Sequence, residues 1–240
     1  VIDGNTRAVV ATVPVGEFPW GIAVDPGTRK VYVANAGPST VSIIDGNTNT
    51  VVQSVPVGER PTAIAINTAT HTAYVVNTNA QNVSIIGPSF DVVATIPIAG
   101  PDLTASTPIT IAIDPVTQFV YVAGYLHNGT GFWPAMRMID GATNTSIPGL
   151  VAQWTSDWSV EALAINRATG WGYSVWNLAT GQGDELFPSD KFADHRFDAR
   201  GRLLTPLHDG VPKIATSFTR SLHSVAVDDA RNIVYVTGTM

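Results

Sequence analysis

Short runs of β-branched and aromatic residues, bounded by turn-forming residues, follow one another along the chain. Ile22–Val24 and Val31–Val33 are two such runs, and Asp25-Pro26-Gly27 begins the turn between them. Runs of this length between turn formers predict β-strands. Asp-Gly followed by Asn or Ala between two apolar runs predicts a tight hairpin. Because no segment shows a sustained 3.6-residue period with caps, the pattern predicts an all-β chain.

These runs belong to an internal repeat. A strand of the type Ile22-Ala23-Val24, followed by an acidic residue or Asn, precedes a strand of the type Val31-Tyr32-Val33-Ala34-Asn35, and the pair recurs along the whole chain. The tyrosine of the second strand marks each copy, at intervals of 42, 47, 52 and 62 residues: Tyr32, Tyr74, Tyr121, Tyr173 and Tyr235. Five copies at a period near that of a four-stranded blade predict a β-propeller.

We expect residues 1–240 to form a single β-propeller domain of four-stranded blades. The repeat units lie near residues 1–42, 43–85, 86–137, 138–180 and 181–240, offset from the true sheets. The chain begins at the third strand of one unit and stops after the second strand of another, so the termini are expected to interlock in one blade and close a five-bladed ring. The alternative is that the chain is part of a six- or seven-bladed propeller.

The second and third strands of each copy carry a family resemblance. Val-Tyr-Val-Ala-Asn at 31–35 and Ala-Tyr-Val-Val-Asn at 73–77, each followed by a Val-Ser-Ile-Ile strand, resemble the YVTN repeat. The resemblance implies a propeller of prokaryotic surface-layer or exported proteins. That family also includes subunits of periplasmic amine-oxidising enzymes and relatives of lactonase-type propellers.

Composition narrows the classes of partner. The net charge is −6 and there are only three lysines, so nucleic acid is not expected as a partner. No apolar run is long enough to cross a membrane as a helix. The chain has no cysteine, which excludes disulfides and thiolate metal sites. No motif indicates a cofactor or a metal. We expect another protein or a subunit as partner, and a small-molecule ligand stays open.

Aromatic residues gather where the repeat is interrupted. The segment Leu126–Pro134 lengthens the third unit, and five of the six tryptophans lie within residues 133–176. Exposed Trp side chains make binding surfaces, whereas inward-facing ones pack neighbouring blades, and both interpretations stay open. The candidate binding residues are Trp20, His127, Trp133, Trp154, Asp157 and Trp158.

One position of the repeat varies in chemistry from copy to copy. It lies two residues before the apolar core of the first strand, and it is occupied by Trp20, Thr62, Ile109, Glu161 and His223. The innermost strand of a propeller lines its channel, so this position is expected at the channel mouth. Glu161 and His223 could then act as a general acid–base pair, because a carboxylate raises the pKa of a neighbouring imidazole. The alternative is that these are loop residues without a special role.

The sequence therefore predicts an exported scaffold, at the cell surface or in the periplasm, that binds another protein without catalysis. A small hydrolase or lyase, lactonase-like, that uses Glu161 and His223 is the first alternative. An accessory subunit of a periplasmic redox complex, implied by the resemblance alone, is the second.

Overall fold

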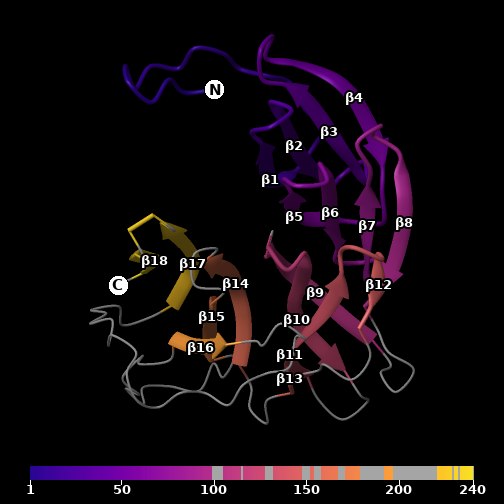
Figure 1. The fold of residues 1–240 in the computed structure, drawn as a ribbon, viewed down its shortest axis with the longest axis vertical. Coiled ribbons are helices and arrows are strands. Elements are labelled where there is room, and N and C mark those ends of the chain that lie inside the picture. The colour runs from indigo at the N-terminus through magenta and orange to yellow at the C-terminus, as the bar shows by residue number, and fades with distance from the viewer. Residues whose placement is uncertain are drawn as a thin grey trace. The chain divides into compact units, whose positions relative to one another are not determined.

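Antiparallel strands joined by tight turns form the structure, a computed structural model of the chain (Figure 1). It describes residues 1–98, 105–114, 116–127, 132–147, 152–153, 158–166, 171–178, 192–196, 221–228, 230–231 and 233–239. Two compact units divide the chain, residues 1–97 and residues 98–240. That residues 1–240 form a single domain stays a prediction.

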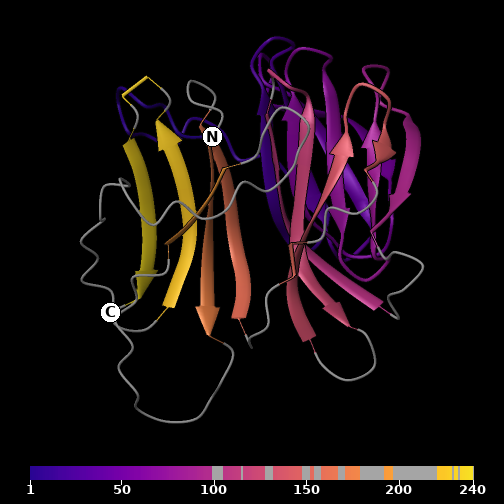
Figure 2. The same cartoon turned by 60° about the horizontal axis from the view of Figure 1, so that its bottom comes forward.

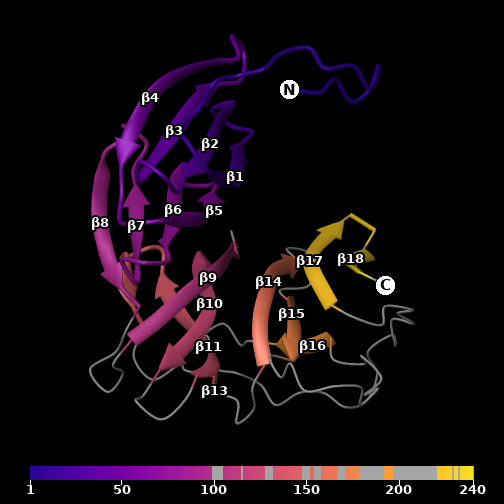
Figure 3. The ribbon, with the colours of Figure 1, turned by 180° about the vertical axis from the view of Figure 1, so that it is seen from behind.

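The first unit contains two four-stranded antiparallel sheets, each in simple sequential order. The first sheet consists of β1 (Pro19–Asp25), β2 (Lys30–Asn35), β3 (Thr40–Asp45) and β4 (Thr50–Pro56). The second consists of β5 (Pro61–Asn67), β6 (Thr72–Asn77), β7 (Asn82–Ile86) and β8 (Val92–Pro97). Figures 1 and 3 show β1 and β5 side by side, with β4 and β8 at the opposite edges of their sheets. The predicted four-stranded blades are confirmed here. Each sheet begins inside a sequence unit, so the sheets are offset from the units as expected.

The described residues of the second unit form three further sheets (Figure 2). One holds β9 (Ala105–Ile113), β10 (Phe119–His127), β11 (Phe132–Asp140), β12 (Thr145–Ser146) and β13 (Ala152–Gln153). The next holds β14 (Trp158–Asn166), β15 (Trp171–Leu178) and β16 (Phe192–Arg196), and the last holds β17 (Ser221–Asp228) and β18 (Ile233–Thr239). The first strands again neighbour one another, because β14 contacts both β9 and β17.

The second and third strands of the first two sheets bury successive residues, so both of their faces are covered. Between the first two sheets the core consists of Tyr32, Ala34, Val41, Ile43 and Val55 from one side and Ile64, Ile66, Ala73, Val75 and Ile86 from the other. Residues two apart on a strand share one face, which explains why this core takes residues two apart from most of its strands. A corresponding core joins the third sheet to Leu163 of β14.

The repeated tyrosine is a core residue in the first three sheets. Tyr32, Tyr74 and Tyr121 are 1%, 0% and 4% exposed. Tyr235 is 52% exposed on β18, whose sheet contains β17 and β18 alone among the described strands. At the other end of the chain, residues 1–10 form a hairpin in which the Val10 amide donates to the Val1 carbonyl at 2.9 Å. The interlocking of the two ends is a contact between the two units and stays a prediction.

A buried carboxylate links the first sheet to the second. Asp25 ends β1, is fully buried, and accepts hydrogen bonds from the Gly27 amide at 3.0 Å and the Thr28 hydroxyl at 2.8 Å. Its second oxygen lies 2.7 Å from Nδ1 of His71, in the turn between β5 and β6. Burial, the largest single influence, raises the pKa of Asp25, but the hydrogen bonds from Thr28, His71 and Gly27 together outweigh it, and the pKa lies below its ordinary value. Nothing in the sequence around His71 indicates this contact.

The lowered pKa of Asp25 predicts a loss of stability in acid. Since the folded-state pKa is the depressed one, the stabilisation is complete above about pH 4 and is lost as the pH falls through the folded-state value. The Asp25→Asn variant should lower the free energy of unfolding by on the order of 1–3 kcal/mol at neutral pH. It should also flatten the decline in stability below about pH 5. Urea unfolding at a series of pH values measures both effects.

A second variant distinguishes the contribution of the Asp25 carboxylate from that of its partner His71. His71→Ala leaves Thr28 and Gly27 as donors to Asp25, so it should remove only part of the pH dependence. An Asp25→Asn protein whose stability falls with pH as steeply as that of the unchanged protein would contradict the assignment.

Candidate functional site

The variable position of the repeat coincides with a β-bulge in the first strand of every sheet. In each described sheet the pairing of the first strand with the second skips one or two residues of the first strand. The skipped residues include the five that the sequence singles out: Trp20, Thr62, Ile109, Glu161 and His223. A bulge residue leaves the ladder and its side chain is redirected, which is why bulges are frequent beside functional sites.

Glu161 and His223 occupy these bulges on two strands that contact each other, β14 and β17. The backbone therefore brings the predicted acid–base pair to corresponding positions of neighbouring strands within one unit. Their roles stay predictions.

In the first unit the bulge position presents an exposed aromatic residue. Trp20 on β1 is 62% exposed, and the Arg60 guanidinium carbon lies 5.5 Å from the centre of its ring. A cation over the face of an indole ring is attracted by the ring quadrupole, by about 0.5–1 kcal/mol at an exposed site. The contact holds Trp20 and Arg60 together across two sheets, because Arg60 immediately precedes β5.

Arg60 and Phe18 occupy equivalent places in the repeat. The segments Gly16-Glu17-Phe18-Pro19 and Gly58-Glu59-Arg60-Pro61 each lead into a first strand. Both residues have left-handed backbone, with φ of 52° for Phe18 and 55° for Arg60. Each carbonyl accepts a hydrogen bond from the residue that follows the second strand, from the Ala36 amide at 3.0 Å and the Thr78 amide at 2.9 Å.

Together Phe18, Trp20 and Arg60 form an exposed group that we call the Trp20 patch. Phe18 is 68% exposed, and a bulky side chain at positive φ carries a conformational cost that the local hydrogen bonds must offset. Glu17 and Glu59 are exposed beside the patch, and Glu59 accepts from the Asn79 amide at 3.2 Å. Among the described residues, no carboxylate lies within 4.0 Å of the Arg60 guanidinium.

The other predicted binding residues belong to the second unit of the chain. His127 ends β10 and Trp133 lies near the start of β11, where the pairs Leu126–Trp133 and His127–Phe132 continue the ladder. The described residues of the predicted insertion, 126–127 and 132–134, therefore extend the pairing of β10 with β11. Trp158 begins β14, opposite Leu178. Trp154 and Asp157 lie outside the described residues.

Sequence reasoning found Trp20 but missed Phe18 and Arg60. The signal was present in the two Gly-Glu-x-Pro segments, which align within the repeat and differ only at the residue with positive φ. No single residue in that motif suggests binding, and only the structure shows that Arg60 reaches the ring of Trp20.

The described part of the chain holds neither a metal-binding cluster nor a membrane-spanning helix. No group of three His, Cys, Asp or Glu side chains there is arranged to hold a metal ion. That part also contains no helix with the length and apolar character needed to cross a membrane.

Comparisons with known proteins bear on the fold. No family model matches the chain, and no curated protein matches it. Among solved structures, a chain of Kuenenia stuttgartiensis hydrazine synthase is similar at a TM-score of 0.73 and 19% identity, over 98% of this chain and 66% of that one. The β-propeller domain of Cps50 (Swd1) from Myceliophteria thermophila is similar at a TM-score of 0.60 and 10% identity, over 94% and 64%. Raptor from Chaetomium thermophilum gives 0.65 and 15%, over 94% of this chain and 19% of that one.

The similarity to these solved structures and the successive antiparallel sheets define the fold class of the protein. The chain is an all-β protein with the β-propeller fold. It spans about two thirds of the hydrazine synthase and Swd1 chains that it resembles. Identities below 20% carry the fold alone, and the resemblance to YVTN propellers, like the number of blades, stays a prediction.

Because Phe18 has a left-handed backbone, replacing it with glycine should stabilise the fold. Phe18→Gly removes an exposed side chain from a left-handed backbone that glycine adopts freely, so the free energy of unfolding should rise by about 1 kcal/mol. Phe90 also has positive φ, at 67°, but packs edge-on against Tyr32 with ring centres 6.5 Å apart. Phe90→Gly is therefore the matched control and should lose stability. Chemical denaturation measures the free energy of unfolding of both variants. A clear loss of stability in Phe18→Gly would contradict the prediction and show that the Phe18 side chain supports the fold.

Proposed function

We propose that this propeller is a non-catalytic scaffold, exported to the cell surface or periplasm, that binds another protein through the Trp20 patch. The observation that carries the proposal is the contact between the exposed Trp20 ring and the Arg60 guanidinium. Trp and Arg are the residue types most enriched among those that dominate binding energy at protein interfaces. Their contact also restricts both side chains before a partner arrives, which lowers the entropic cost of binding.

The chemistry of the patch indicates what it would recognise. One face of the Arg60 guanidinium lies over the indole ring, and its N–H groups stay available for a planar acceptor such as a carboxylate. Phe18 and Trp20 supply apolar area around that charge. We therefore expect the partner to present an Asp or Glu side chain, or a C-terminal carboxylate, beside an apolar residue.

Photo-cross-linking in the cells that make the protein tests the proposal. A benzophenone amino acid in place of Phe18 should yield a discrete adduct with a partner, whereas the same probe in place of Val52 should not. Val52 is the matched control because it is 50% exposed on β4, away from the patch residues in the chain. Trp20→Ala and Arg60→Ala should each weaken the adduct about tenfold or more, as expected for residues that dominate an interface. Equal adducts from both positions, or an adduct unchanged by these variants, would contradict the proposal.

A second candidate is acid–base catalysis by Glu161 and His223. It is favoured by one observation, their places at the bulges of two contacting first strands. The reaction would be hydrolysis or elimination on a small substrate such as a lactone, with one group accepting a proton while the other donates one.

Turnover of a panel of lactones tests this candidate. Glu161→Gln and His223→Asn should each lower kcat by about 10²–10⁴-fold, whereas Asp91→Asn, at an exposed turn, should not. The Trp20 and Arg60 variants should leave such turnover unchanged. Absence of turnover in the unchanged protein, or turnover insensitive to both variants, would exclude the pair as this catalyst.

A further inference from the structure

The same pentapeptide forms a turn twice in the first unit. Ile-Asp-Gly-Asn-Thr occurs at residues 2–6 and again at residues 44–48. In both copies the amide four residues after the aspartate donates to the aspartate carbonyl at 2.8 Å. The Oδ1 atom of the aspartate accepts from the amide two residues on, at 2.9 Å for Asp3 and 2.8 Å for Asp45. Because sequence and turn are the same, a difference in reactivity between the copies has to come from their surroundings.

The surroundings of the two copies differ at the glycine amide. The Gly46 amide donates to the Arg29 carbonyl at 2.8 Å, which ties the second copy to the turn between β1 and β2. The Gly4 amide donates to no acceptor among the described residues. Gly4 is also exposed, and apart from its chain neighbours no atom lies within 4 Å of the place that a Cβ would take. The backbone nitrogen of Gly4 is therefore open to reaction in a way that the nitrogen of Gly46 is not.

The two copies also differ in how firmly the turn is held. The second copy joins β3 to β4 within a four-stranded sheet, and Nζ of Lys30 lies 2.9 Å from Oδ2 of Asp45. The first copy lies in the hairpin of residues 1–10, which has one bridge, between Ile2 and Val9, and belongs to none of the described sheets (Figure 1, indigo). A hairpin of two strands is only marginally stable in water. The first copy should therefore open far more often than the second.

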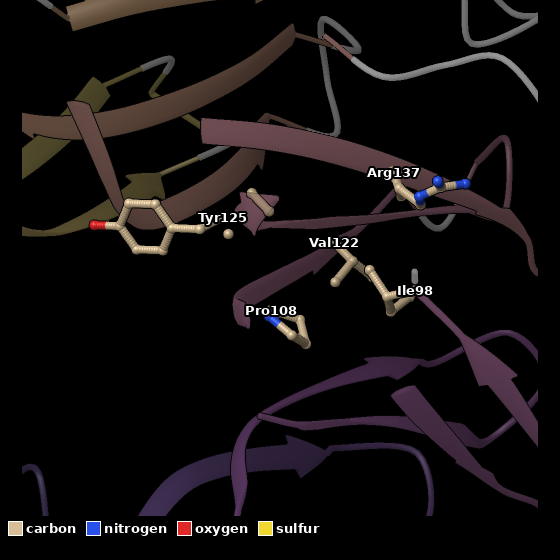
Figure 4. A pocket seen from close by; sticks show the side chains of 7 residues that line it. Ile98, Pro108, Val122, Tyr125 and Arg137 are labelled. Carbon is tan, nitrogen blue, oxygen red and sulfur yellow. The ribbon is translucent and has the colours of Figure 1, made fainter. Parts of the chain in front are cut away.

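A third Asp-Gly turn, at the end of β11 in the third sheet, is protected like the second copy. Gly141 is buried, and its amide donates to the Gln118 carbonyl at 3.0 Å. The small pocket of this sheet includes no residue of the turn; Figure 4 labels the lining residues Ile98, Pro108, Val122, Tyr125 and Arg137. The turn at Asp140 is therefore a second internal reference for an Asp-Gly pair whose amide is held.

We propose that Asp3-Gly4 is a site of spontaneous covalent modification, at which the aspartate is converted to isoaspartate. The Gly4 nitrogen attacks Cγ of the protonated Asp3 carboxyl group and forms a new C–N bond. One carboxyl oxygen leaves as water with the carboxyl proton and the amide proton, which closes a succinimide ring. Water then adds to the Asp3 backbone carbonyl and breaks its bond to the Gly4 nitrogen, so that the chain runs through the former side chain.

The reaction needs no reagent except water, and the product has the same atoms as the starting protein. Glycine favours the ring closure because it has no side chain to obstruct the approach of the nitrogen. A hydrogen bond from the amide opposes it, because the peptide unit must leave its acceptor before the nitrogen can turn toward Cγ. Conversion also removes the Oδ1 acceptor of the Asn5 and Thr6 amides, so the turn should not re-form in the product. The proposal does not depend on the Trp20 patch.

Peptide mapping of the aged protein tests the proposal. The folded protein is incubated for weeks at mildly acidic pH and digested with trypsin, which separates Asp3 from Asp45 by cutting after Arg7 and Lys30. Isoaspartyl peptides are then resolved by chromatography and identified by electron-transfer fragmentation. Isoaspartate should form about tenfold or more faster at Asp3 than at Asp45, because a held group reacts only when its region opens. In a denaturing concentration of urea the two identical pentapeptides should react at equal rates.

Two variants give independent readouts. Gly4→Ala should slow the conversion sharply and leave the fold unchanged, because space is free for the added Cβ. Asp3→Asn closes the same ring with loss of ammonia, so its reaction changes the mass of the protein. It should deamidate about tenfold or more faster than the matched control Asp140→Asn, where the glycine amide is held. Isoaspartate at Asp3 no faster than at Asp45 in the folded protein would overturn the proposal and show that the Gly4 amide is protected as the Gly46 amide is.

Discussion

Everything in the described structure depends on the need of each sheet to cover its apolar face with the next sheet. One sheet of four short strands cannot bury both faces, so stability comes from the layer between neighbours. Tyr32, Ile43, Ile64 and Val75 meet in such a layer between the first two sheets. Polar contacts such as Asp25 with His71 then act at the rim of that layer, where they fix how the sheets are aligned.

The fold was largely predictable because the apolar residues that each sheet must cover recur in every copy of the repeat. Short runs of β-branched and aromatic residues around Tyr32, Tyr74 and Tyr121, recurring between turn residues, specified the strands and the repeated blades without any tertiary information. The contact of His71 with Asp25 was not predictable, since a turn residue reveals nothing of the sheet beside it. Arg60 was missed for the same reason: its contact with Trp20 joins residues 40 positions apart that only the stacking of two sheets brings together.

The functional proposals rest on departures from an otherwise uniform scaffold. At Trp20 and Arg60 the departure is an exposed aromatic–cation contact beside strands that are alike in both sheets. The repeat thus supplies an internal reference, in which a change at one position can be judged against the same position in a neighbouring sheet.

The bulge in every first strand has a consequence for how such a chain can change. Because the skipped residue makes no ladder contact with the second strand, its identity is uncoupled from the pairing that builds the sheet. An indole, a hydroxyl, an aliphatic group, a carboxylate and an imidazole occupy these five places on closely similar backbones. A substitution at this position can therefore change the side-chain chemistry of one sheet without changing its strand pairing. For this reason the first strands are a suitable place to engineer a ligand site.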